Sequence, residues 1–308
     1  MAEQKKINHF SPKYALTQMR KSLVSYAFVL PFMSVFFVFV LLPVIISIFI
    51  SLTSFDMLRP PKFIGVENYL NLFLRDSIFL KSIGITTVLA AIVGPVSYIL
   101  SFTMAWLINE FPPKLRALIT LILYAPAISG NVYMIWTILF SGDDYGYLNG
   151  ILLKLGLIPQ SVQWLKDTKY MMLIVIVVAL WSSLGTSFLA FIAGLQGVDR
   201  SLYEAGMVDG VKNRWQEMFF ITLPSMKPQL LFGAVMAITS SFGIGGICTA
   251  LCGFPSTDYA VHTIMNHLED YGGMRYEMGY ASAIATILFV IMLLCNFAIQ
   301  KLLSKVGE

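Results

Sequence analysis

Long uncharged stretches alternate with short polar segments along the whole chain. Six stretches contain no Asp, Glu, Lys, Arg or His, and each exceeds the roughly 20 residues that a helix needs to cross a bilayer. A backbone in hydrocarbon must satisfy its own hydrogen bonds, which a uniformly apolar run does as a helix, whereas the strands of a membrane barrel alternate in polarity. The pattern predicts an all-α polytopic membrane protein with six transmembrane helices, at residues 25–52, 82–109, 117–142, 170–198, 229–257 and 278–300.

The composition agrees with a chain that folds in lipid. Of 308 residues, 57% are hydrophobic and 12% are charged, against about 25% charged in an ordinary soluble domain. The first uncharged run has 28 residues and no small-residue cleavage site follows it, so we expect it to stay as a membrane helix rather than be removed. No connecting segment is long enough for a soluble domain, and we expect a single transmembrane domain over residues 1–308.

Lysine and arginine fall unequally on the two sides of the six predicted helices. With the N-terminus inside, thirteen lie on the inner side and eight on the outer side. The excess of positive charge on inner loops places both termini in the cytoplasm, with a basic tail at 1–24 and the longest inner loop at 199–228. The net charge of +4 therefore reflects topology, and no basic stripe with interleaved aromatics indicates nucleic-acid binding.

The inner loop 199–228 is unusually polar for its position between two apolar runs. Asp199 is a predicted helix N-cap, and Asp209-Gly210 predicts a turn after the first short helix. The loop predicts a second helix closed by Leu223-Pro224, with an apolar stripe at Trp215, Met218, Phe219 and Thr222. From amphipathicity alone, the loop is either a connector on the lipid headgroups or a docking element for a soluble partner.

The sequence of this loop resembles a known motif. "EAGMVDG" at 204–210 followed by "ITLP" at 221–224 is similar to the loop of ABC-importer membrane subunits, usually EAA, three residues, Gly, nine residues and Ile-x-Leu-Pro. Gly206 stands where a second Ala is usual, and ten residues instead of nine separate Gly210 from Ile221. The segments "YAFVLPF", "GVENYLNLF", "LYAPAISG", "LQGVDRSLYEAG" and "GYASAIA" extend the resemblance over nearly the whole chain, to the carbohydrate-uptake branch that includes the maltose transporter's membrane subunits.

The resemblance implies that this loop forms a coupling helix seated in a cleft of an ATP-binding subunit. Gly210 permits a turn that a Cβ would obstruct, Trp215 or Phe219 is suited to fill an apolar cleft, and Glu204 either pairs with a base on the partner or caps the helix. The coupling residues expected on this basis are Glu204, Ala205, Gly206, Asp209, Gly210, Trp215 and Phe219.

The resemblance also implies an assembly in the bacterial inner membrane. Two ATP-binding subunits, a second homologous permease subunit in a heterodimer and an extracellular solute-binding protein are the expected partners. The chain has no Gly-rich phosphate loop, so we expect it to be no enzyme and to bind no cofactor, with ATP and Mg²⁺ held by the partner ATPase. No predicted span contains an ionisable carboxylate, histidine or basic residue, which also argues that any energy for pumping comes from another subunit.

A polar solute that crosses between helices needs hydrogen-bonding groups and aromatic faces at mid-depth. Candidate pathway residues are therefore the polar and aromatic ones in predicted spans three to five, of which the resemblance favours Trp181, Ser182, Thr186, Ser240 and Phe242. The alternative is that Ser, Thr and Gly here only allow close helix packing. The full set is Tyr124, Asn131, Trp181, Ser182, Ser183, Thr186, Ser240, Ser241 and Phe242.

The remaining reactive side chains point to no separate chemistry. The three cysteines lack metal-like spacing and are expected to be apolar fillers. His262 and His267 lie in an outer loop, where we expect a face that meets the binding protein in preference to a metal site. The sequence thus predicts a permease subunit that imports a neutral sugar or oligosaccharide. The alternatives are another solute such as glycerol phosphate, a passive channel, and, least favoured, a membrane-embedded enzyme.

Overall fold

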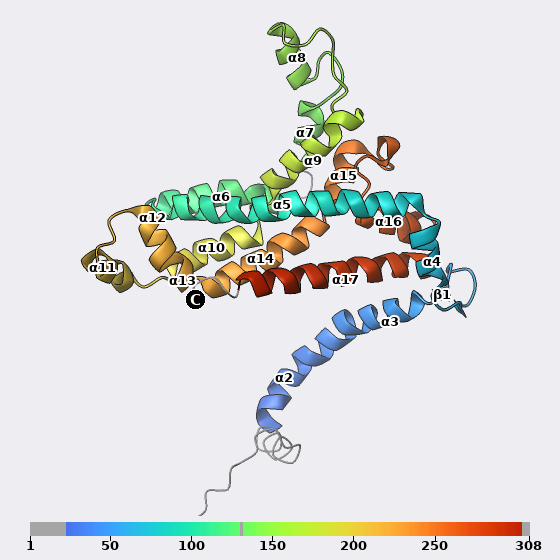
Figure 1. The fold of residues 1–308 in the computed structure, drawn as a ribbon, viewed down its shortest axis with the longest axis horizontal. Coiled ribbons are helices and arrows are strands. Elements are labelled where there is room, and N and C mark those ends of the chain that lie inside the picture. The colour runs from blue at the N-terminus through green and yellow to red at the C-terminus, as the bar shows by residue number, and fades with distance from the viewer. Residues whose placement is uncertain (1–22, 130–131, 304–308) are drawn as a thin grey trace, which may run out of the picture.

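The computed structural model describes residues 23–129 and 132–303, which are mostly helical (Figure 1). Residues 1–22 of the predicted tail and the candidate Asn131 lie outside the described residues. The elements are α2 (Leu23–Phe36), η1 (Phe37–Leu41), α3 (Leu42–Ile50), β1 (Thr53–Ser54), β2 (Lys62–Phe63), α4 (Glu67–Leu74), α5 (Ser77–Asn109), α6 (Pro113–Ile128), α7 (Tyr133–Leu139), α8 (Tyr147–Lys154), α9 (Thr168–Ser182), α10 (Thr186–Gln196), α11 (Arg200–Val208), α12 (Arg214–Glu217), η2 (Met218–Thr222), α13 (Leu223–Ser225), α14 (Lys227–Phe242), α15 (Gly245–Cys252), η3 (Thr257–Tyr259), α16 (Ile264–Glu269), η4 (Asp270–Met274) and α17 (Met278–Leu303).

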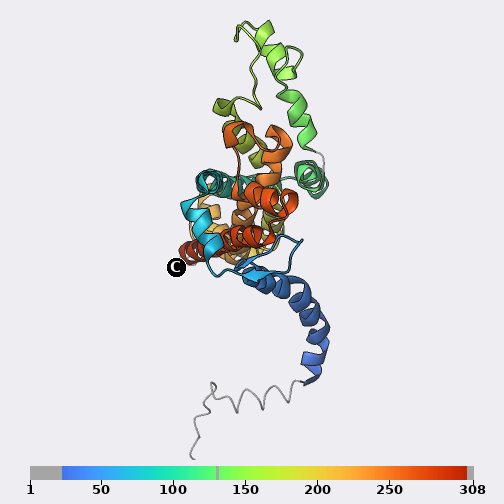
Figure 2. The same cartoon turned by 90° about the vertical axis from the view of Figure 1, so that its right-hand side faces the viewer.

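The long helix α5 runs beside α14, α14 runs beside α17, and α10 packs on α5 and α14 (Figure 1). We call the end of this bundle that carries α11 to α13 the inner end, after the predicted topology. The C-terminal end of α17 lies at the same end, while α4 and the β1–β2 hairpin lie at the opposite, outer end (Figure 1). Both views show α2 and the segment around α8 standing away from the bundle on opposite sides (Figure 2).

Among the described residues, four helical segments are long and apolar enough to cross a membrane. Up to six spans result if each of two bent pairs, α6 with α7 and Arg214–Ser225 with α14, counts as one. The predicted continuous helix at 229–257 is wrong, because the chain there forms α14 and α15 with a break at Gly243 and Ile244. Three glycines at 243, 245 and 246 lower helix propensity at this point. The predicted run 117–142 likewise divides into α6 and α7.

The core of the bundle is aromatic where α5, α10 and α14 meet. Phe191 of α10 is fully buried and packs edge-on against Tyr98 and Phe102 of α5, at 5.4 and 5.7 Å between ring centroids. On the other side, a Cβ on Gly233 of α14 would overlap the Phe191 ring. A glycine is needed here because it lets two helices approach around a large side chain.

Candidate functional site

The inner-end element comprises residues 199–225, and we call it the coupling element. Its first helix, α11, is capped by Asp199, whose carboxylate accepts a hydrogen bond from the backbone N–H of Ser201 at 3.0 Å. This bond, with little opposing desolvation, lowers the pKa of Asp199. Gly210 follows α11 with φ of +94°, a conformation that L side chains rarely adopt. The predicted N-cap and the predicted turn glycine are both confirmed.

The second helix of the coupling element contains a π-helical turn, which the sequence did not predict. The backbone N–H of Leu223 donates to the carbonyl oxygen of Met218, five residues back, where an α-helix would span four. This turn therefore holds one residue more than an α-turn, which accounts for the ten residues between Gly210 and Ile221. It also makes the predicted stripe wrong, because Met218 is buried with Thr222 in the bundle while Trp215 and Phe219 are exposed.

Most of the predicted coupling residues form the surface of this element. Gly206 is the exception, since it is buried and an added Cβ would lie 2.6 Å from Ile221 Cδ1. That close approach explains why glycine replaces the usual alanine. The exposed members of the predicted set are Glu204, Ala205, Asp209, Gly210, Trp215 and Phe219.

Two contacts that the sequence did not predict attach the coupling element to α5, and a third joins α11 to η2 within the element. The Arg214 guanidinium bridges Glu217 of its own helix at 2.9 Å and Glu110 at the inner end of α5 at 2.7 Å. Trp215 packs on Trp106 of α5, with 5.3 Å between ring centroids. The hydroxyls of Tyr203 and Thr222 lie 2.9 Å apart. No short-range sequence pattern links 110 with 214, so only the folded bundle reveals this joint.

A cavity of about 760 Å³, which we call the mid-span cavity, opens beside the middle of α5 at Val93 and Ser97. Its other walls come from α6, α7, α9, α10, α14 and α15. No charged side chain lines it among the residues that the structure describes. Six of the nine candidate pathway residues line this cavity, namely Tyr124, Ser182, Ser183, Thr186, Ser240 and Ser241.

Two helix breaks face the mid-span cavity. One lies between α9 and α10, at Ser183 to Gly185, and the other lies between α14 and α15, at Gly243 and Ile244. Irregular backbone at membrane depth is tolerated where it is buried in protein or lines a polar cavity, and interrupted helices of this kind form substrate sites in many transporters. These backbone positions escaped the sequence analysis, which read both segments as continuous helices.

The hydroxyl groups that line the mid-span cavity differ in their hydrogen-bond partners. Those of Ser182, Ser183 and Ser241 donate to carbonyl oxygens of the preceding helical turn, at 2.7 to 3.2 Å. Their oxygens can still accept a hydrogen bond from a solute. Thr186 and Ser240 are exposed in the cavity wall and present their hydroxyls directly. Contact of any of these groups with cargo stays a prediction.

Trp181 and Phe242 are not among the residues that line the mid-span cavity. Trp181 packs edge-on against Trp136 of α7, with 5.3 Å between ring centroids. Phe242 is only 6% exposed and belongs to the core that α14 shares with α17. Trp181 thus packs against another aromatic ring and Phe242 packs in the core, and neither environment could be inferred from the position of the residue in the sequence.

At the outer end, the two loop histidines are buried, contrary to the expectation of a face for a binding protein. His262 is 3% exposed and His267 is 2% exposed. His267 Nε2 donates to Asp76 at 3.0 Å, and its Nδ1 lies 3.3 Å from His262 Nε2. The same Asp76 oxygen accepts from Tyr280, while the other oxygen caps α5 at the Phe79 N–H. Within the described part of the chain, no group of three metal-ligating side chains forms a metal site.

Burial sets the protonation states in this outer network. Desolvation lowers the pKa of His262 to about 4 and also lowers that of His267, despite the nearby Asp76 charge. Burial would raise the pKa of Asp76, but the Phe79 N–H bond, His267 and the Tyr280 hydroxyl outweigh it and lower that pKa. The network is therefore two neutral imidazoles on one carboxylate at neutral pH.

Comparisons with known proteins agree with this arrangement. Residues 113–306 match the family described as binding-protein-dependent transport system inner membrane component. The probable ABC transporter permease YesP of Bacillus subtilis is 31% identical over 288 residues, covering 92% of this chain and 91% of that protein. AraP, the permease of the arabinooligosaccharides transport system of Bacillus subtilis, is 30% identical over 92% of this chain and 89% of its own length.

A solved structure shares the fold. A bacterial ABC transporter involved in the import of the acidic polysaccharide alginate contains a chain that superposes with a TM-score of 0.72 at 24% identity, covering 94% of this chain and 99% of that one. The family match at residues 113–306 includes the coupling element and the part of the mid-span cavity that lies outside α5. The chain therefore belongs to the family of inner membrane components of binding-protein-dependent transport systems.

Proposed function

We propose that this chain is the permease subunit of an ATP-driven importer for a neutral sugar or oligosaccharide and forms half of its translocation pathway. The mid-span cavity carries this proposal, because its lining offers hydroxyls and two tyrosines and, among the described residues, no charged side chain. A neutral saccharide needs hydroxyl partners only, whereas an anion would lose its hydration without a compensating charge from this subunit. The arabinooligosaccharides system of the relative AraP supports a saccharide cargo.

A second permease subunit completes the pathway in this proposal. The mid-span cavity is open along one side, where Ser129, Thr186 and Ser240 are exposed. The N-terminal span Val24–Ile50 has no buried residue in its most apolar stretch, and its α2 end lies away from the bundle (Figure 2). Both surfaces suit contact with a homologous permease subunit in a heterodimer. In this proposal both termini of the chain lie in the cytoplasm of a bacterial cell.

Two ATP-binding subunits would drive transport through the coupling element, with ATP and Mg²⁺ bound on those subunits. Trp215 and Phe219 are 62% and 59% exposed, so their rings are available to fill an apolar cleft. Glu204 is exposed on the same element and is suited to pair with a base of the ATPase. An extracellular binding protein would deliver the cargo at the outer end.

The test is ATP hydrolysis and uptake by the complete purified transporter, with a panel of neutral sugars, uronate oligosaccharides and glycerol phosphate. We expect a neutral saccharide to stimulate hydrolysis. Ser240→Trp should then reduce stimulated uptake by tenfold or more, because an indole projecting from α14 obstructs the cavity. Thr239→Trp is the matched control, since Thr239 is exposed on the same helix and is not among the cavity-lining residues. Stimulation only by an anion, uptake without ATP, or equal effects of the two variants would refute the proposal.

A further inference from the structure

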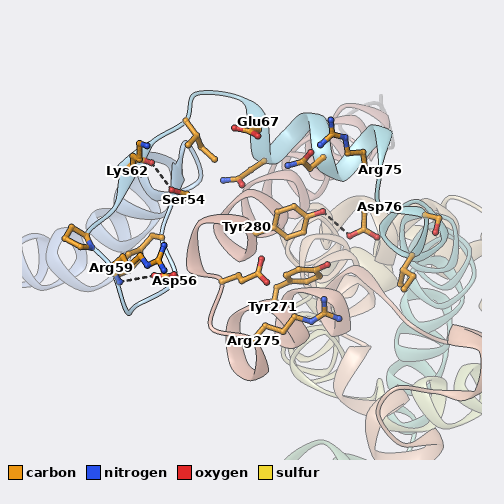
Figure 3. A pocket seen from close by; sticks show the side chains of 18 residues that line it. Ser54, Asp56, Arg59, Lys62, Glu67, Arg75, Asp76, Tyr271, Arg275 and Tyr280 are labelled. Carbon is orange, nitrogen blue, oxygen red and sulfur yellow. Dashed lines mark hydrogen bonds between the residues drawn. The ribbon is translucent and has the colours of Figure 1, made fainter.

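A second cavity, of about 990 Å³, lies at the outer end of the bundle. Figure 3 shows its walls, which come from the segment around the β1–β2 hairpin, α4, the start of α5, and the junction of η4 with α17. We call it the outer cavity. It is at the upper end of the roughly 300 to 1,000 Å³ that small-molecule sites occupy. Asp76 at its floor is 17 residues from Val93 along α5, so about 25 Å separates it from the mid-span cavity.

Buried hydrogen bonds hold the walls of the outer cavity in place. Asn68 of α4 is 6% exposed and donates to the carbonyl oxygens of Ser51 and Thr53, at 2.8 and 2.9 Å. The backbone N–H of Gly279 donates to the Phe55 carbonyl at 2.9 Å, and a Cβ on Gly279 would overlap the hairpin backbone. The cavity is therefore preformed, which reduces the ordering cost of binding.

The side chains in these walls combine aromatic faces with planar polar groups. Tyr271 and Tyr280 lie 4.5 Å apart between ring centroids, and the Arg275 guanidinium covers Tyr271 at 4.3 Å. Glu67 and Arg75 of α4 face the same space (Figure 3) and take part in no ion pair in the described portion of the chain. Carboxylates accept and guanidinium groups donate pairs of hydrogen bonds, which suits the adjacent hydroxyls of a sugar ring.

The charges that line the outer cavity balance, so no net field selects an anion or a cation. Balanced planar donors and acceptors beside tyrosine rings favour a neutral polyhydroxylated ligand. The four acids are Asp56, Glu67, Asp76 and Glu277, and the four bases are Arg59, Lys62, Arg75 and Arg275.

We propose that the outer cavity is a second, low-affinity binding site for a neutral oligosaccharide on this subunit, which holds cargo before it reaches the mid-span cavity. The inference rests on the proposed function for the class of cargo. Its evidence is separate, since the residues of the two cavities do not overlap.

The test is protection of an introduced cysteine in the complete transporter without its binding protein. Asn71→Cys places a thiol in the cavity wall, and Leu74→Cys places one on the same helix at a position that is 76% exposed and outside the lining. The three native cysteines are first replaced by alanine in a transporter whose activity is verified. With arabinotriose or maltotriose at 10 mM and a Kd of about 1 mM, maleimide labelling of Asn71→Cys should slow about tenfold.

Labelling of Leu74→Cys should not change with either trisaccharide. Protection should disappear when Arg75→Gln is added and should persist when Ser240→Trp blocks the mid-span cavity. No protection, or protection that Ser240→Trp abolishes, would overturn the site. Protection by unloaded binding protein but by neither sugar would show a docking surface for that protein and would also overturn it. If a trisaccharide stimulates ATP hydrolysis without protecting Asn71→Cys, the outer site fails and the proposed function stands.

Discussion

The ion pair between Arg214 and Glu110 links the coupling element to α5, a helix from which it is far removed in sequence. Glu110→Gln removes the charge and keeps the size of the side chain. The two side chains are 62% and 46% exposed, so the pair is worth about 0.2 to 1 kcal/mol and is screened by salt. If it holds the coupling element in its working position, saccharide-stimulated ATP hydrolysis and uptake should fall by about 1.4-fold to fivefold.

Reconstituted transporter measured at low and at 1 M salt provides the assay. Wild type should approach the Glu110→Gln rate as salt rises, while the variant itself should respond little. Arg214→Gln added to Glu110→Gln should cost little more than the first change, because both remove one interaction. Glu217→Gln is the control, since it breaks the arm of Arg214 that stays within the coupling element. Wild-type rates in Glu110→Gln together with a loss in Glu217→Gln would refute a joint to α5.

Three further outcomes follow from the structure. Gly210 has φ of +94°, so Gly210→Val should strain the backbone and lower uptake while the protein still inserts into the membrane. Gly84→Ala is the control and should leave uptake unchanged, because a Cβ there meets open space. Equal uptake by the two variants would show that backbone strain at Gly210 does not matter. Burial lowers the pKa of His262 to about 4 in the folded protein, against about 6.5 in the unfolded chain. Between these values the unfolded chain binds the proton more readily, so the midpoint temperature of thermal unfolding should fall as the pH drops. The fall should be smaller in His262→Gln. Impermeant thiol reagent should label Tyr145→Cys, which is 97% exposed before substitution, in intact cells and not Lys212→Cys; the reverse result would invert the topology.

The features that follow from local sequence were predicted correctly. The length of the uncharged apolar runs predicted the helical fold class, because a backbone in lipid has few ways other than a helix to satisfy its hydrogen bonds. Asp199 and Gly210 were placed because a cap and a positive-φ turn depend on neighbours only a few residues away. The hydroxyl-bearing candidates in three spans line one cavity, because small polar residues in apolar runs gather where helices face one another, and their role in a pathway stays a prediction.

The features that depend on tertiary packing were missed. The break at Gly243 falls inside an uncharged run, and no charge marks it. The π-turn at Met218 changes which side of a helix faces the bundle, which a 3.6-residue period cannot anticipate. Asp76 and His267 are 191 residues apart, so their contact exists only once α5 and the outer loop pack together.

The helix α5 extends from the outer cavity past the mid-span cavity to the coupling element. Asp76 caps its outer end and holds the buried histidine network, Ser97 near its middle lines the mid-span cavity, and Glu110 at its inner end meets Arg214 of the coupling element. A helix of 33 residues is about 50 Å long, and apart from Pro95, which has no backbone N–H to donate, its hydrogen-bonded backbone resists stretching. If an ATPase subunit displaces the coupling element, as the proposed function requires, we expect the displacement to reach both the mid-span cavity and the outer cavity through α5.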